Sequence, residues 1–199
     1  MIQMYGVEIP NQLNELTVQQ FDELNKIENN QELDTIEKWI EKFIYLGVPD
    51  KAFDSMELEE FANYIKLFNK SEVPKGEKVT ELVIDKYTYQ ANETIGVKDL
   101  GLLERIYRSQ SDDFCAQTLA ILFKRTDLTR TEHYAPAHLK FKVNLMKKQS
   151  AEIAFPYIME ILSKITKIAE KKVDETTEEL ESSNSEPMAG TESNWSNRI

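Results

Sequence analysis

The sequence predicts a mainly α-helical protein: a multi-helix domain with one small β-hairpin inserted and a disordered acidic C-terminal tail. Apolar residues recur every three or four positions over most of residues 18–168, which is the period of an amphipathic helix. The period changes to two over residues 79–91, as expected for half-buried strands. From Val173 onward Glu, Ser, Thr and Asn prevail and no apolar face recurs, which is typical of a disordered segment.

Three amphipathic helices are predicted at the beginning of the chain. In the first, Thr17 can act as N-cap and Gln20, three positions later, completes a capping box. Asp34 and Glu37 repeat this arrangement in the second helix, which ends where Gly47 can adopt the left-handed C-cap conformation. The expected core stripes of the three helices are Val18, Phe21, Leu24 and Ile27; Ile36, Ile40 and Phe43; and Leu58, Phe61, Ile65 and Phe68.

A turn-rich linker, "EVPKGEK", separates these helices from the predicted hairpin "VTELVIDKYTYQA", which turns at Asp85 and Lys86. A lone hairpin is marginally stable in water, so we expect this one to pack on the helices around it. The predicted organisation is an N-terminal helical subdomain over residues 1–72, a hairpin plus helical subdomain over 73–172, and a disordered tail over 173–199.

The second subdomain continues with helices at 97–110 and 112–125. Asp112 and Asp113 suit the first turn of the latter helix, and Lys124 and Arg125 suit its last turn. The segment after it, "TDLTRTEHYAP", reads as a loop whose Pro136 opens another helix. Ser150 can cap a final long helix over residues 151–172.

Composition narrows the classes of protein to consider. The chain has 199 residues, of which 41% are hydrophobic, so it can bury a sizeable core. It contains no apolar run of the ~20 residues that a membrane span requires, and its N-terminus lacks the features of a signal peptide. A single cysteine rules out an internal disulfide framework and favours a reducing, intracellular compartment.

The formal net charge of −11 is unevenly distributed. Residues 1–72 carry 15 acidic against 6 basic side chains, whereas residues 124–172 carry 11 basic against 5 acidic ones. An acidic protein with one basic segment is a poor non-specific binder of nucleic acid. The basic segment could meet phosphate or an acidic partner, although a solvated helix face explains it more simply.

Cys115, His133 and His138 are the residues that could suggest chemistry. A small buried apolar side chain explains Cys115, which shares a helix face with Leu119 and Leu122. The two histidines are five positions apart, whereas two zinc ligands on one helix face require a spacing of four. We therefore expect no metal, no cofactor and no catalytic residue, although spacing leaves open a Cys–His pair that meets in space.

The order of elements resembles the tail-assembly proteins of tailed bacteriophages, which are chaperone-like factors that engage tail components during morphogenesis. The resemblance rests on "NELTVQQFDEL", on "TLAILFKRTD" with Tyr134 beyond it, and on the element order from about Ile9 to Ile168. It implies a non-enzymatic phage protein that binds phage tail or other virion proteins, in the host cytoplasm or within the virion itself.

Two alternatives stay open at this point: a structural or packaged component of the virion, and an enzyme that uses Cys115 with one of the histidines. We expect no membrane partner, and the oligomeric state is unknown. The isolated Trp195 in the tail is either incidental or a docking anchor. The wide isoleucine stripe of the final helix is either core or a partner surface beside basic residues, and the residues expected to meet a partner are Lys147, Lys148, Lys164, Ile161, Ile165 and Ile168.

Overall fold

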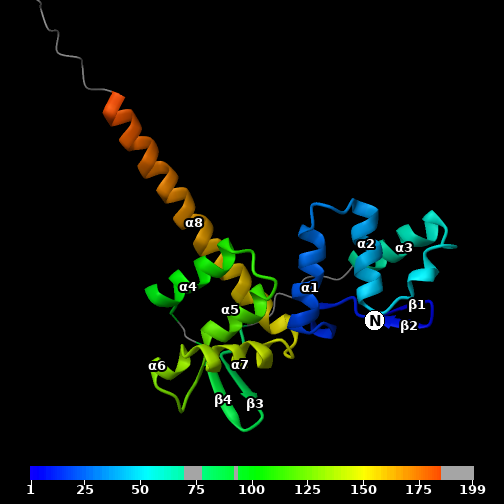
Figure 1. The fold of residues 1–199 in the computed structure, drawn as a ribbon, viewed down its shortest axis with the longest axis horizontal. Helices are drawn as coiled ribbons and strands as arrows, with labels where there is room; N and C mark the ends of the chain where they lie inside the picture. Colours follow the sequence, from blue (N-terminus) through cyan, green and yellow to red (C-terminus); the bar gives the residue numbers. More distant parts are fainter. Residues whose placement is uncertain (70–77, 92–93, 185–199) are drawn as a thin grey trace, which may run out of the picture. The chain divides into compact units, whose positions relative to one another are not determined.

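The computed structural model describes residues 1–69, 78–91 and 94–184. Most of them are helical, with a two-stranded and a three-stranded antiparallel sheet among the described residues (Figure 1), so the predicted mainly α fold is confirmed. Contacts divide the chain into two compact units, residues 1–161 and 162–199. The predicted boundary near residue 72 lies outside the described residues and stays a prediction.

The chain begins with a hairpin that the sequence analysis did not predict. Strands β1 (Ile2–Met4) and β2 (Val7–Ile9) pair antiparallel around Tyr5 and Gly6. Both turn residues have positive φ angles, 49° and 79°, as a two-residue hairpin of matching twist requires. Met4 is the last residue of β1 and Ile9 the last residue of β2, and both are fully buried. Their burial fixes the hairpin on the core.

The first two long helices follow their sequence signals. Helix α1 (Val18–Asn29) and helix α2 (Thr35–Tyr45) both begin with the predicted capping boxes. Gly47 has φ 105°, and its amide donates to Ile44 O at 2.9 Å while the Val48 amide donates to Phe43 O at 2.9 Å. These two bonds close the Schellman motif at the end of α2.

Helix α3 (Leu58–Asn69) completes an aromatic cluster with α2. A short 3₁₀ turn, η1 (Leu13–Glu15), precedes α1, and another, η2 (Asp50–Ala52), precedes α3. Phe43 of α2 packs edge-on against Phe61 and Phe68 of α3, with ring centroids 6.1 and 5.9 Å away. The packing of α3 on α2 therefore depends on aromatic rings.

The predicted second hairpin is confirmed, but it gains a third strand. Strands β3 (Glu81–Ile84) and β4 (Tyr87–Ala91) turn at Asp85, and β5 (Phe123–Arg125) pairs with β4. The sequence placed Lys124 and Arg125 in the last turn of a helix, which was wrong. Phe123 is fully buried, and pairing gives the marginal hairpin the third strand that stabilises a small sheet.

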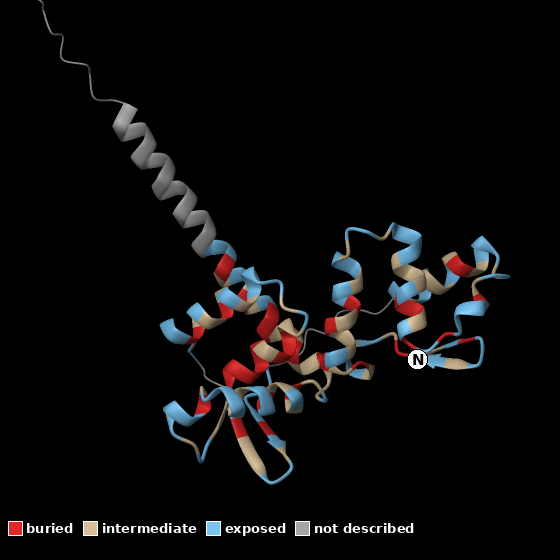
Figure 2. Cartoon of the chain, viewed as in Figure 1, coloured by how far each residue is buried: buried red, intermediate tan, exposed pale blue. Residues whose placement is uncertain are grey.

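Helix α4 (Val97–Arg108) matches its prediction, and α5 (Phe114–Leu122) is the most buried helix of the first unit (Figure 2). Its own N-cap residue, Asp113, makes no capping side-chain bond. Instead, Asp22 of α1 accepts hydrogen bonds from the amides of Cys115 and Ala116, at 2.8 and 3.1 Å. A residue far away in sequence thus caps the N-terminus of α5.

The predicted loop after α5 contains a short helix, α6 (Arg130–His133). The prediction was wrong because Thr129 and Glu132 form a capping box, a signal that the sequence already contained. Helix α7 (Pro136–Met146) begins with its proline, as predicted.

Helix α8 (Ala151–Asn184) starts after Ser150, whose hydroxyl accepts a hydrogen bond from the Glu152 amide at 3.3 Å. The helix runs past Val173, where the sequence predicted the tail to begin. The segment 174–184 contains four glutamates and Leu180, which have high helix propensity, and extending an existing helix avoids a new nucleation step. Residues 185–199, including Trp195, lie outside the described residues. Within the described part of the chain, no helix has the length and apolarity that membrane crossing requires.

Candidate partner-binding hollow

The basic residues predicted to meet a partner do not form one uniform surface. Lys147 Nζ lies 2.8 Å from Asp113 Oδ1, and the carbonyl oxygen of Lys147 accepts a hydrogen bond from the Gln19 amide. Lys148 is exposed, and Lys164 belongs to the second unit. Lys147 therefore holds other elements of the first unit in place.

The predicted isoleucine stripe is largely interior. Ile161 has no exposed surface and belongs to the core of the first unit, and Ile165 in the second unit is also buried. The side chain of Ile168 lies outside the described side chains. Partner binding by these residues and by the basic ones above stays a prediction.

Cys115 lies at the N-terminal end of α5, against Asp22 of α1. The thiol is buried, and burial, assisted by the neighbouring Asp22 carboxylate, raises its pKa far above the ordinary value. Because the thiolate is the nucleophilic form, this environment holds Cys115 in its unreactive state. The structure therefore places Cys115 as a core residue of α5.

The structure does bring the two histidines together. The ring centroids of His133 and His138 are 6.3 Å apart. Burial is the main cause that lowers the pKa of both imidazoles, and the positive charge of the nearby Lys142 is the second cause. Among the described residues no group of three or more His, Cys, Asp or Glu side chains is arranged to hold a metal ion. A metal-free protein stays a prediction.

A buried polar network surrounds this pair. Asp99 of α4 accepts hydrogen bonds from Lys124 Nζ, at 2.9 Å, and from the Tyr134 hydroxyl. Lys142 of α7 is almost fully buried and donates to the carbonyl oxygen of Phe123 at 3.1 Å. Burial, together with the charge of Lys124, lowers the pKa of Lys142 to about 8. The network ties α4, β5 and α7 together and rigidifies this end of the first unit.

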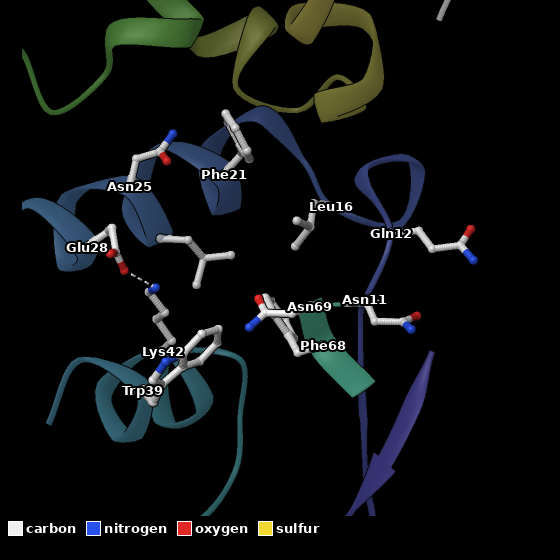
Figure 3. Close-up of a pocket in the computed structure, with 11 residues that line it drawn as sticks. Asn11, Gln12, Leu16, Phe21, Asn25, Glu28, Trp39, Lys42, Phe68 and Asn69 are labelled. Atoms are coloured by element: carbon white, nitrogen blue, oxygen red, sulfur yellow. Dashed lines mark hydrogen bonds and ion pairs between the residues drawn. The ribbon is translucent and has the colours of Figure 1, made fainter. Parts of the chain in front are cut away.

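A concave site lies elsewhere, beside α1 and α2. A hollow of about 360 Å³ is bordered by these helices, by the end of α3 and by the segment before η1 (Figure 3). Its apolar lining consists of Leu16, Phe21, Leu24, Trp39 and Phe68. Its polar lining consists of Asn11, Gln12, Asn25, Glu28, Lys42 and Asn69.

Helical spacing explains how the sequence builds one wall of the hollow. Phe21, Leu24, Asn25 and Glu28 occupy positions i, i+3, i+4 and i+7 of α1 and therefore share one face. Leu24 is buried, whereas Phe21 keeps part of its surface exposed. The predicted core stripe of α1 is thus covered incompletely, and its uncovered part faces the hollow.

Trp39 forms the opposite wall. Its ring lies 5.9 Å from that of Phe43 and 5.7 Å, edge-on, from that of Phe68, so the aromatic cluster holds it in place. Lys42 Nζ lies 4.3 Å from the centroid of the Trp39 ring and forms an ion pair with Glu28 across the hollow (Figure 3). The Lys42 ammonium lowers the pKa of the Glu28 carboxyl. This pair neutralises the cation at the hollow and leaves half-buried aromatic surface beside it.

Sequence reasoning did not find this hollow. It assigned Phe21 and Phe68 to the core and made no use of Trp39. A tryptophan with a lysine three positions later on one helix was the available signal, but the same pattern is common on solvated helix faces. The arrangement depends on the packing between α1, α2 and α3, which the sequence pattern does not specify.

Comparison of the chain with protein-family models, with curated proteins and with solved structures gave no match.

Proposed function

We propose that this chain is a non-enzymatic, chaperone-like protein of a tailed bacteriophage, which binds another phage protein in the host cytoplasm during tail or virion assembly. The resemblance of "NELTVQQFDEL" and "TLAILFKRTD" to phage tail-assembly proteins supports the biological setting. The hollow at Trp39 carries the binding function, because it offers a partner a concave apolar surface.

The chemistry of the hollow is that of a protein-binding site. Interface hot spots are enriched in tryptophan, and they lie in pockets where an apolar centre is surrounded by polar groups. Trp39 and Phe21 supply the centre, and exposed amides such as Asn25 supply the rim. The volume of about 360 Å³ lies at the low end of the ~300–1,000 Å³ that small-molecule pockets span, which suits a few side chains of a partner.

The test is capture of partners by the tagged full-length protein from infected cells, followed by mass spectrometry. The decisive variant is Asn25→Tyr, which adds bulk at the rim without removing a packed side chain. Its matched control is Asn29→Tyr, one turn further along α1 and also exposed. We expect one phage protein to be captured by the wild type and by Asn29→Tyr, and to be lost with Asn25→Tyr.

The same experiment includes purified virions. A chaperone should be absent from them, whereas the alternative function, a structural or packaged virion component, requires the chain to be retained. Capture of no phage protein would contradict the proposed function, and equal capture by both variants would contradict the role of the hollow.

A further inference from the structure

We propose that the hollow binds a basic peptide segment of the partner protein, which inserts one large apolar side chain against Trp39. This inference rests on the proposed function and specifies the chemistry of the partner. Its occupant is a segment of a different protein, and not a nucleic acid, a lipid or a second copy of this chain.

The rim of the hollow favours a peptide. Gln12, Asn25 and Asn69 are exposed side-chain amides that border the same hollow. Each carries both a donor and an acceptor, and so does every unit of a peptide backbone. A peptide segment that crosses the rim can therefore be satisfied by these amides, whereas a lipid tail offers them no polar group.

The floor of the hollow favours a large apolar anchor. Leu16 and Leu24 are buried, while the rings of Phe21, Trp39 and Phe68 are only partly covered. An apolar side chain placed among these rings would remove the remaining apolar surface from water. Trp39 is already fixed by its two ring neighbours, so binding would order few additional side chains.

Charge complementarity favours a basic segment. Residues 1–69 contain 14 acidic and 5 basic side chains, and Lys42, the cation at the hollow, is paired with Glu28. The surrounding field is therefore negative, which attracts a basic segment and repels a nucleic acid backbone.

The experiment uses the purified full-length protein and short synthetic peptides. The chain has two tryptophans, so Trp195→Phe leaves Trp39 as the only indole and makes its fluorescence specific for the hollow. The first peptide carries lysines around a single phenylalanine. The second has glutamate in place of every lysine, and the third has serine in place of the phenylalanine.

We expect the lysine–phenylalanine peptide to change Trp39 emission saturably, with an affinity that falls as salt rises. The other two peptides should bind at least about tenfold more weakly, equivalent to about 1.4 kcal/mol. Asn25→Tyr in the same background should abolish the response, and Asn29→Tyr should preserve it. Equal binding of the lysine and glutamate peptides would overturn the inference, as would an unchanged response in Asn25→Tyr.

Two outcomes separate this inference from the proposed function. Loss of capture by Asn25→Tyr together with no preference for the basic peptide would contradict a basic occupant while leaving the hollow as the partner site. Concentration-dependent self-association abolished by Phe141→Ser would overturn the inference by identifying a second copy as the occupant, because exposed Phe141 beside exposed Lys140 on α7 has the same chemistry as the proposed peptide.

Discussion

Replacing Asp22 by alanine tests whether a cap supplied from another helix holds the first unit together. Asp22 is buried, and its two carboxylate oxygens accept hydrogen bonds from the amides of Cys115 and Ala116. These amides belong to the second and third residues of α5, which are the ones that an N-cap side chain normally satisfies. In Asp22→Ala both would be left without this acceptor.

The size of the effect follows from the burial. A buried donor left without a partner costs about 1–3 kcal/mol, so the two amides together would cost about 2–6 kcal/mol. Burial disfavours the charged form of the carboxyl, because it raises the pKa of Asp22 despite the two hydrogen bonds. Alanine relieves that desolvation, so we expect the free energy of unfolding to fall by about 2–4 kcal/mol.

Asp34→Ala is a matched control. Asp34 also accepts hydrogen bonds from two helical amides, those of Ile36 and Glu37, at 2.8 and 2.9 Å. Asp34 is exposed, so water can replace it, and the loss should be about 1 kcal/mol. The two variants remove the same chemistry and differ in burial.

Urea and thermal unfolding followed by circular dichroism would measure both variants. For a chain of this size about 2–4 °C of melting temperature corresponds to 1 kcal/mol, so Asp22→Ala should melt roughly 4–16 °C below the wild type. The reasoning would be refuted by a deficit in Asp22→Ala no larger than that in Asp34→Ala.

Three further predictions concern the rest of the first unit. Burial holds the pKa of Lys142 at about 8 instead of 10.5, so the wild type should gain on the order of 3 kcal/mol of stability as pH rises from about 8 to 10.5. Lys142→Met should lose this slope, as urea unfolding at pH 7 and 10 would show. Leu122→Asp should abolish cooperative unfolding, because it buries an unpaired carboxylate. The control Val83→Asp, at a strand position that is 67% exposed, should melt near the wild type. Equal melting temperatures of the two variants would contradict the packing of α5. The protein should purify without stoichiometric zinc or iron and melt unchanged with a chelator, and elemental analysis that found one metal per chain would contradict the reading of His133 and His138.

Local signals in the sequence were sufficient for most helices. Thr17 with Gln20 and Asp34 with Glu37 placed the starts of α1 and α2, because a capping box involves only residues three positions apart. Thr129 and Glu132 form the same pattern at the start of α6, although the segment that contains them was predicted to be a loop. Where the stabilising contact is local, the sequence predicts the element.

Long-range contacts explain what the sequence could not predict. Strand β5 forms because β4 lies next to it, although the segment around Lys124 reads as the end of a helix. Asp22 reads as a polar residue on a solvated helix face, yet it is buried against α5. The hollow likewise exists because packing between helices leaves Trp39 partly uncovered. None of these features has a pattern within one segment.

Helix α1 connects the stability of the first unit to its proposed function, but through separate faces. The face that carries Asp22 bonds to α5, and the face that carries Phe21 and Asn25 lines the hollow. If the hollow were only an imperfection in packing, filling its rim with Asn25→Tyr would leave partner capture unchanged. If it is the binding site, Asn25→Tyr should lose the partner at wild-type stability, and a conservative change at Asp22 should lower stability while the folded fraction still binds. Stability and partner capture should therefore be measured for the Asn25 variant and for the Asp22 variant. A binding role predicts that the Asn25 variant loses capture and keeps its stability, whereas a purely structural role predicts that it keeps capture.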